Sequence, residues 1–299
     1  MFMINCFTVE IDIALKGKLI KDLENQGFKI EKIPYAFFAA KKKGISCVFY
    51  ESGKFTVQGK EKDEFIEFYL EPEILKSLAY THPEASMNLS SRIGVDESGK
   101  GDFFGPLCVV ALFADKTTIT TLIKIGAKDS KKISDSEILK KAEIIKKTCP
   151  FAFLCLKPEK YNELYAKFKN LNFLLAWCHA TVIDNLVKRT ACTTVIVDQF
   201  AYPAVLEKAI KQKKIDINLT QKTHAEEDIV VAAASILARA YFLEGLEKLS
   251  ASYAIKIPKG ASKQVKDTAQ KLILKYGNDI LKKVAKTHFK TAQNLENEN

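Results

Sequence analysis

One stretch, from Ile93 to Leu107, constrains most strongly what this chain can fold into. An apolar, strand-like segment leads directly into two adjacent carboxylates, Asp96 and Glu97, and then into the turn Gly99-Lys100-Gly101. Because neighbouring strand residues point to opposite faces, the two acids can share a site only where the strand ends or bends, and glycines permit such a bend. The glycines also leave backbone N–H groups open to a phosphate, with Lys100 as a point charge beside them. The stretch therefore suggests chemistry on a phosphodiester, although two acids in such a turn, taken alone, are more often a polar surface turn.

Strand and helix signals alternate from Arg92 onward. Strands are expected at 92–97, 106–114, 151–156, 194–198 and 215–219, and helices at 117–125, 135–147, 158–168, 172–189, 203–212, 228–249 and 262–278. A sheet that is part antiparallel and part parallel, flanked by helices, fits this order. We therefore expect an α/β domain over residues 92–299, with a frayed end from about His288.

Residues 1–80 read as a separate small α+β unit. Strands are expected at 7–11, 35–40, 45–50 and 55–58, and helices at 15–26 and 62–70. Residues 81–91 are polar, contain a proline and lack periodicity, which is typical of a linker.

Charge and cysteine usage limit the class of protein. The formal charge of +10 and the pI near 9.0 favour a polyanionic partner but do not establish one. Seven scattered cysteines argue against a disulfide framework and a zinc knuckle, so we expect core thiols in a reducing compartment. The sequence shows neither a secretory signal nor an apolar run that we expect to cross a membrane, which favours the cytoplasm.

Further acids follow two other apolar segments. Asp198 ends the β-like run Thr193–Val197, where α/β sheets commonly place their sites, although in isolation the start of a turn explains it better. Glu226, Glu227 and Asp228 precede an alanine-rich helix, where capping and the helix dipole explain acids too. Small residues would let this helix approach the sheet closely. Carboxylates with no Cys or His cluster beside them suit Mg²⁺ or Mn²⁺ better than zinc.

The stretch from Gly94 to Leu107 resembles the first signature of the type 2 ribonuclease H family, most closely that of ribonuclease HIII. The similarity lies in Gly94-Val95-Asp96-Glu97, the Gly-x-Gly turn, an aromatic residue and Gly105-Pro106-Leu107. Thr223-His224-Ala225-Glu226 and the segment Ala233–Arg239 also resemble this family, and point to Glu226 as the fourth acid.

The resemblance implies a ribonuclease H-like fold preceded by a TATA-binding-protein-like domain that helps to hold substrate. It implies that Asp96, Glu97, Asp198 and Glu226 hold two cations, Mg²⁺ or Mn²⁺. The implied reaction is hydrolysis of the RNA strand of RNA/DNA hybrids, leaving 5′-phosphate and 3′-hydroxyl ends. The protein would act as a monomer without a membrane or an obligate protein partner.

Substrate contacts are expected from three groups of residues. The turn contributes backbone and side-chain groups, the family-like segments downstream contribute a lysine and two asparagines, and a lysine-rich hairpin contributes charge. These residues are Ser98, Gly99, Lys100, Gly101, Lys131, Asn170, Asn172, Lys41, Lys42, Lys43 and Lys54. The hairpin lysines are explained equally well as a solvated loop tip or an edge-strand guard. Trp177 and His179 can simply be core residues.

Two alternatives remain open. Ribonuclease HII has an arginine where this chain has Lys100, so HII-like cleavage at single ribonucleotides in duplex DNA is the first alternative. The second is a non-catalytic nucleic-acid-binding protein on the same fold. The presence of four acids speaks against it, because buried negative charge facing phosphates gives a binding module no advantage.

Overall fold

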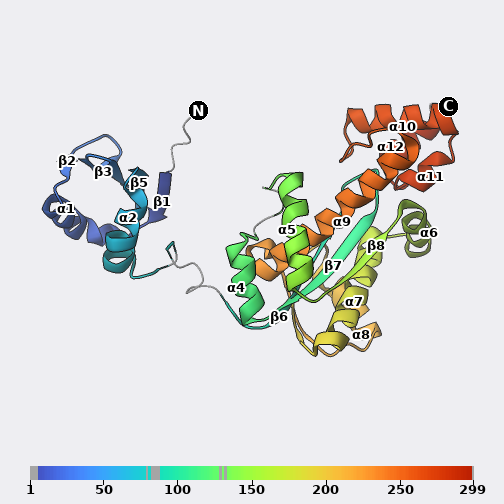
Figure 1. The fold of residues 1–299 in the computed structure, drawn as a ribbon, viewed down its shortest axis with the longest axis horizontal. Helices are drawn as coiled ribbons and strands as arrows, with labels where there is room; N and C mark the ends of the chain where they lie inside the picture. The colour runs from blue at the N-terminus through green and yellow to red at the C-terminus, as the bar shows by residue number, and fades with distance from the viewer. Residues whose placement is uncertain (1–5, 79, 82–87, 128–129, 131–132, 298–299) are drawn as a thin grey trace. The chain divides into compact units, whose positions relative to one another are not determined.

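The computed structural model describes residues 6–78, 80–81, 88–127, 130 and 133–297. The chain divides into two compact units, Met1–Asn88 and Leu89–Asn299. Figure 1 shows them in blue to cyan and in green to red, respectively. Each unit has its own sheet and its own hydrophobic core.

The first unit is an antiparallel sheet covered by helices. Its strands are β1 (Cys6–Glu10), β2 (Lys29–Glu31), β3 (Ala36–Lys42), β4 (Ile45–Tyr50) and β5 (Lys54–Gly59), in the spatial order β1-β5-β4-β3-β2. Its helical segments are η1 (Ile13–Leu15), α1 (Lys16–Asn25), α2 (Lys62–Phe65) and η2 (Ile66–Leu75).

The core of this unit forms on one face of the sheet. Leu19 and Leu23 of α1 and Ile66 of η2 pack against inward-facing aromatic residues such as Phe49. The alternating residues of the strands point to the opposite face, where Thr8 and Thr56 are register partners. The segment expected as one α-helix over residues 62–70 instead becomes a π-helix after Phe65, with Pro72 inside it. Proline has no N–H to donate, so it does not support a regular α-helical pattern.

The second unit is built on a mixed sheet. Its strands are β6 (Arg92–Ser98), β7 (Leu107–Ala114), β8 (Phe151–Leu156), β9 (Thr194–Asp198) and β10 (Asn218–Lys222), in the spatial order β10-β9-β6-β7-β8. The pairs β6/β7 and β7/β8 are antiparallel, whereas β6/β9 and β9/β10 are parallel. The expected α/β fold class is confirmed.

Helices cover both faces of this sheet (Figure 1). On one face lie α4 (Lys116–Lys124), α5 (Asp135–Thr148) and the long α9 (Ile229–Tyr253), and on the other lie α6 (Pro158–Phe168), α7 (Leu171–Thr190) and α8 (Pro203–Gln212). The helices α10 (Lys263–Tyr276), α11 (Ile280–Val284) and α12 (Lys290–Asn297) pack around the segment that links β6 to β7.

Helix α9 lies unusually close to strand β6. A Cβ atom at Gly94 would come within 2.5 Å of the backbone of Val230 and Val231, so only glycine permits this approach. Among the described residues, α9 is the one helix that is long and apolar enough to cross a membrane, but 72% of its most apolar window is buried inside this unit. Its apolar character is therefore explained by its place in the core.

Three further sequence expectations need correction. Strand β10 lies at Asn218–Lys222 and not at 215–219, because its register follows pairing with β9, in which Lys222 lies opposite Asp198. The segment Lys290–Asn297 is helical rather than frayed, since α12 buries Ala292 and Leu295.

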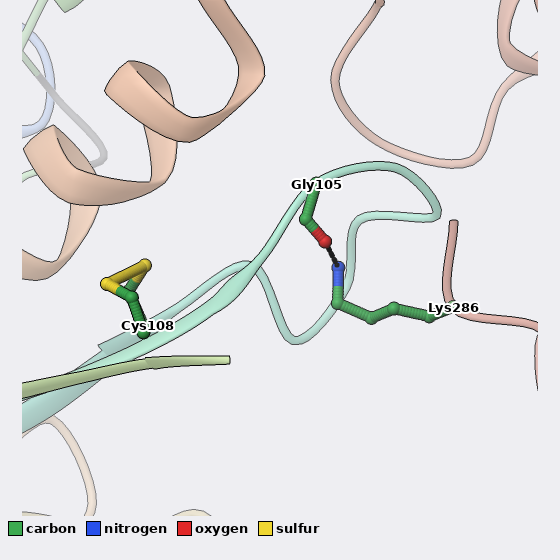
Figure 2. The surroundings of a disulfide bond; sticks show 4 residues. Gly105, Cys108 and Lys286 are labelled. Carbon is green, nitrogen blue, oxygen red and sulfur yellow. Dashed lines mark hydrogen bonds between the residues drawn. A yellow bond between two sulfur atoms is a disulfide. The ribbon is translucent and has the colours of Figure 1, made fainter. Parts of the chain in front are cut away.

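The third correction concerns the cysteines. Cys108 of β7 and Cys155 of β8 are direct cross-strand partners and form a disulfide (Figure 2). They are 47 residues apart in sequence, so strand register, and not spacing, brings them together. The other five cysteines carry free thiols: Cys6, Cys47, Cys149, Cys178 and Cys192.

Candidate active site

The two adjacent acids lie at the end of the central strand β6 but on different faces of the sheet. Gly94 packs on α9, and alternation places Asp96 on the same side. Val95 belongs to the core on the α7 side, and Glu97 follows it there. Strand β6 ends at Ser98, one residue after Glu97, so the acids lie where the strand ends, as expected, and not at a bend within it.

Asp198 lies beside Asp96 on the α9 face. The parallel register pairs Val95 with Val197, which puts the two aspartates level at the carboxyl ends of β6 and β9. Asp198 Oδ1 accepts a hydrogen bond of 2.9 Å from the backbone N–H of Ala225. Ala225 begins the short 3₁₀ helix η4 (Ala225–Glu227), so Glu226 follows the residue that contacts Asp198.

The three neighbouring acids before α9 have different surroundings. Asp228 caps α9, accepting from Val230 N–H at 2.9 Å, and it also pairs with buried Arg92 at 2.8 Å. Glu227 is exposed, whereas the Glu226 side chain is only 16% exposed. Asp228 therefore has a structural role, and Glu226 is the acid best placed to join Asp198.

The ionisation of Asp96 is unfavourable in the absence of a cation. Burial, and then the neighbouring charge of Glu97, raises the pKa of Asp96 to about 8. The charge of Asp198 adds to this effect, while hydrogen bonds from Ser235 and from the backbone N–H of Glu97 oppose it. A divalent cation would relieve this repulsion.

Glu97 is stabilised in its charged form from the other face. Burial disfavours its ionisation, but the hydrogen bond from His179 and the charges of His179 and Lys100 outweigh burial and lower the pKa of Glu97. His179 Nε2 lies 3.1 Å from Glu97 Oε2, and the ring packs on Phe200 at 4.5 Å between centroids. His179 is thus both a core residue and a direct partner of a candidate metal ligand, a role that the sequence pattern did not reveal.

A second pair of residues missed from the sequence supports Asp96. Ser235, within the alanine-rich part of α9, hydrogen-bonds to Asp96. Its hydroxyl also lies 2.8 Å from the hydroxyl of Ser130, and both residues are buried. A single serine among small apolar residues on a buried helix face was the available signal.

The glycine turn after β6 is fixed in shape. Gly99 has a φ of +92°, and a Cβ there would lie 2.2 Å from Pro106 O, so this position requires glycine. Gly101 has no such strain, and a Cβ added there would meet no atom within 4 Å, which leaves open space beside it. Lys100 Nζ lies 3.6 Å from Glu97 Oε1 and donates to Phe200 O at 3.3 Å.

The remaining predicted substrate residues are separated by the structure. Asn170 caps α7 through Oδ1, accepting from the exposed Asn172 at 2.8 Å. In the first unit, Lys41 and Lys54 lie on the face without the helices, and Lys41 pairs with Glu31 at 2.7 Å.

Lys42 points to the helix-covered face, over the ring of Phe28, because it follows Lys41 in the same strand. Lys43 is exposed at the hairpin turn, and Lys131 lies outside the described residues.

The donor set fits a hard divalent cation. Asp96, Glu97, Asp198 and Glu226 offer only oxygen ligands, and burial together with the charges of Glu97 and Asp198 raises the pKa of Asp96. Within the described ranges, no three carboxylate, imidazole or thiolate groups form a ready-made cluster for a metal. One reason that the acids do not form such a cluster is that Glu97 points toward His179, on the opposite face of the sheet from Asp96.

Comparison with known proteins identifies relatives over nearly the whole chain. Residues 93–292 match a family described as ribonuclease HII, and residues 11–79 match a domain of unknown function. A ribonuclease HIII of Protochlamydia amoebophila is 50% identical over 285 residues, 95% of either chain. A ribonuclease HIII of Chlamydia felis is 48% identical, again with 95% of each chain covered.

A solved structure is similar over the same extent. The crystal structure of Bst-RNase HIII in complex with Mn²⁺ is 28% identical, with a TM-score of 0.68, and the match covers 99% of this chain and 100% of the other.

Proposed function

The chain belongs to the ribonuclease HIII family, and from that premise we propose which of its residues perform the reaction of the family. The protein is a metal-dependent endonuclease that hydrolyses the RNA strand of RNA/DNA hybrids, leaving 5′-phosphate and 3′-hydroxyl ends. One observation supports the residue assignment. At the carboxyl ends of β6 and β9, Asp96 lies beside Asp198, and Asp198 contacts the segment Ala225–Glu226. Glu97 is the neighbour of Asp96 in the chain.

Asp96, Glu97, Asp198 and Glu226 are the residues that would hold the cations. Bound there, two Mg²⁺ or Mn²⁺ ions would neutralise charge on the phosphodiester and lower the pKa of the attacking water. The protein groups orient the ligands: His179 fixes Glu97, Ser235 fixes Asp96 and the Ala225 N–H fixes Asp198. Before a cation binds, the raised pKa means that Asp96 carries a proton at neutral pH.

The turn Gly99–Gly101 would contact the ribose and phosphate of the RNA strand, since the 2′-OH is what marks RNA against DNA. The open space beside Gly101 permits a close backbone approach, and Lys100 supplies positive charge at the edge of the acids. With lysine in place of the arginine of ribonuclease HII, we assign hybrids, and not single embedded ribonucleotides, as the preferred substrate. A duplex DNA carrying one ribonucleotide tests this preference.

The first unit would add sequence-independent affinity through the sheet face that carries Lys41 and Lys54. Removing one lysine–phosphate pair should reduce the slope of log affinity against log salt by about 0.9. Lys41→Glu with Lys54→Glu should therefore flatten this slope by about 2 and leave single-turnover cleavage intact. Lys42→Glu, from the same strand but on the other face, is the matched control.

The protein would act as a cytoplasmic monomer that needs neither a membrane nor an obligate protein partner. Size-exclusion chromatography with light scattering tests the monomer, and a dimer peak at micromolar concentration would contradict it.

The site assignment is tested by neighbouring substitutions before α9. Glu226→Gln should abolish cleavage of a labelled hybrid while binding persists, because the substitution removes a cation ligand. Glu227→Gln should remain active, and Asp228→Asn should lose stability before activity. Equal activity of the Glu226 and Glu227 variants would reject Glu226 as a ligand.

A further inference from the structure

Lys286 is a lysine with no exposed surface whose ammonium group is surrounded by backbone carbonyls. Nζ donates to Asp102 O at 2.8 Å, to Gly105 O at 2.8 Å and to Phe104 O at 3.3 Å, and Figure 2 shows Lys286 beside Gly105. The three acceptors match the three N–H donors of a protonated lysine. Burial disfavours this charge and lowers the pKa of Lys286 to about 7, only partly offset by Asp102.

The main chain on either side of Lys286 joins the same segment. Lys286 N–H donates to Phe103 O at 2.8 Å, and Gly105 N–H donates to Val284 O at 3.0 Å. Phe104 and Ala285 form an isolated antiparallel bridge. The segment Val284–Lys286 therefore pairs with residues 103–105 through a single antiparallel bridge.

A second anchor holds the start of this segment. Gly260 N–H donates to Asp102 Oδ1 at 2.6 Å, and Phe103 N–H donates to Gly260 O at 2.9 Å. Asp102 is the residue directly after Gly99-Lys100-Gly101, and its N–H reaches Gly99 O at 3.4 Å. The glycine turn is thus held at one end by β6 and at the other by contacts from the C-terminal part of the chain.

The chemistry of these contacts distinguishes Lys286 from an ordinary core residue. An apolar side chain would fill the same space without the cost of burying a charge. Only a group with several donors can hold three carbonyls that converge from one short loop. The cost of burying the Lys286 charge is explained if the conformation of residues 102–105 has a functional role in addition to its packing.

We propose that Lys286 is a positioning residue that sets the Gly99–Gly101 turn against the ribose and phosphate of the substrate strand. The inference rests on the proposed role of that turn in substrate binding. It assigns to the C-terminal segment a part in selecting RNA over DNA, although Lys286 itself touches no substrate.

The test compares Lys286→Met with Leu281→Ala. Leu281 is buried in the hydrophobic cluster that contains Ala285, the neighbour of Lys286, and its backbone hydrogen-bonds within the C-terminal helical region, so its variant controls for reduced stability. Asp102→Ala releases the second anchor from a partly exposed position and serves if Lys286→Met does not fold. All variants are assayed at a temperature where thermal scans show them folded.

Two measurements are made on the full-length variants. Hydrogen exchange of the amides of residues 99–105 should be at least about 10-fold faster in Lys286→Met, or in Asp102→Ala, than in Leu281→Ala. The KM for a hybrid should rise at least about 10-fold, with a smaller change in kcat, while affinity for duplex DNA stays within about twofold of wild type.

Unchanged exchange at residues 99–105 would overturn the anchoring. Faster exchange with an unchanged KM, or an equal effect in Leu281→Ala, would overturn the positioning role. If the wild-type protein cuts no hybrid, the proposed function itself fails, and the exchange result still decides whether Lys286 anchors the turn.

Discussion

Substitution of Gly94 by alanine perturbs the contact on which the geometry of the acids depends. The added Cβ would lie 2.5 Å from Val230 C, 2.5 Å from Val231 N and 2.7 Å from Val230 O, all of them backbone atoms of α9. The first turn of this helix must then move by about 1 Å to reach ordinary van der Waals separation. Overpacking of this kind costs about 1–3 kcal/mol.

The same displacement should reach the catalytic residues. Glu226 lies three residues before the start of this helix, and Ser235 lies further along the helix that moves. A misplacement of about 1 Å can cost roughly 100-fold in rate. For a unit of this size, each kcal/mol lowers Tm by about 2–4 °C, so we expect a decrease of about 2–12 °C.

Calorimetry on the full chain, followed by hybrid cleavage below the transition, measures both effects. The control is Gly17→Ala in α1, where the new methyl group would meet no atom within 4 Å apart from the backbone of its own helix and its chain neighbours. This variant should gain about 0.5–1 kcal/mol from helix propensity. A Gly94→Ala protein with wild-type Tm and rate would refute the close packing of α9 on β6.

The ionisable and hydrogen-bonded groups support the remaining predictions. The pKa of Asp96 is raised from 3.8 to about 8, so cation binding should release close to one proton at about pH 7 and almost none at about pH 9. Titration calorimetry in buffers of different ionisation enthalpy measures the number of protons released. The metal-free protein should also lose stability as pH rises from about 4 to about 8, because the folded state keeps a proton on Asp96 that the unfolded chain has released. A Tm that does not change with pH over this range would contradict this prediction. Ser235→Ala should weaken Mg²⁺ affinity about 10-fold through loss of a hydrogen bond to a charged group, whereas Ser250→Ala in the same helix should not. Arg92→Met should cost about 3 kcal/mol in denaturant unfolding, because it leaves Asp228 partly buried without its partner.

Local patterns predicted the elements that carry the acids. The apolar runs before Asp96 and Asp198 became β6 and β9, and the alanine-rich segment became α9, because strand alternation and small residues are properties of the chain itself. Their placement at one edge follows from parallel pairing of neighbouring strands.

The partners of the acids could not be predicted in the same way. His179 and Ser235 are far in sequence from Glu97 and Asp96, and their contacts exist only after the helices pack on the sheet. The pairing of Cys108 with Cys155 likewise depends on the register of β7 and β8, which sequence spacing does not contain.

Cleavage of an end-labelled RNA/DNA hybrid by wild type and Asp96→Asn, with Mg²⁺ or Mn²⁺ and beside duplex DNA and duplex RNA, tests the central claim most directly. The account predicts that wild type cuts only the RNA strand of the hybrid, and that the variant binds the hybrid but does not cut it. Undiminished cleavage by Asp96→Asn, or binding without cleavage by both proteins, would contradict the account.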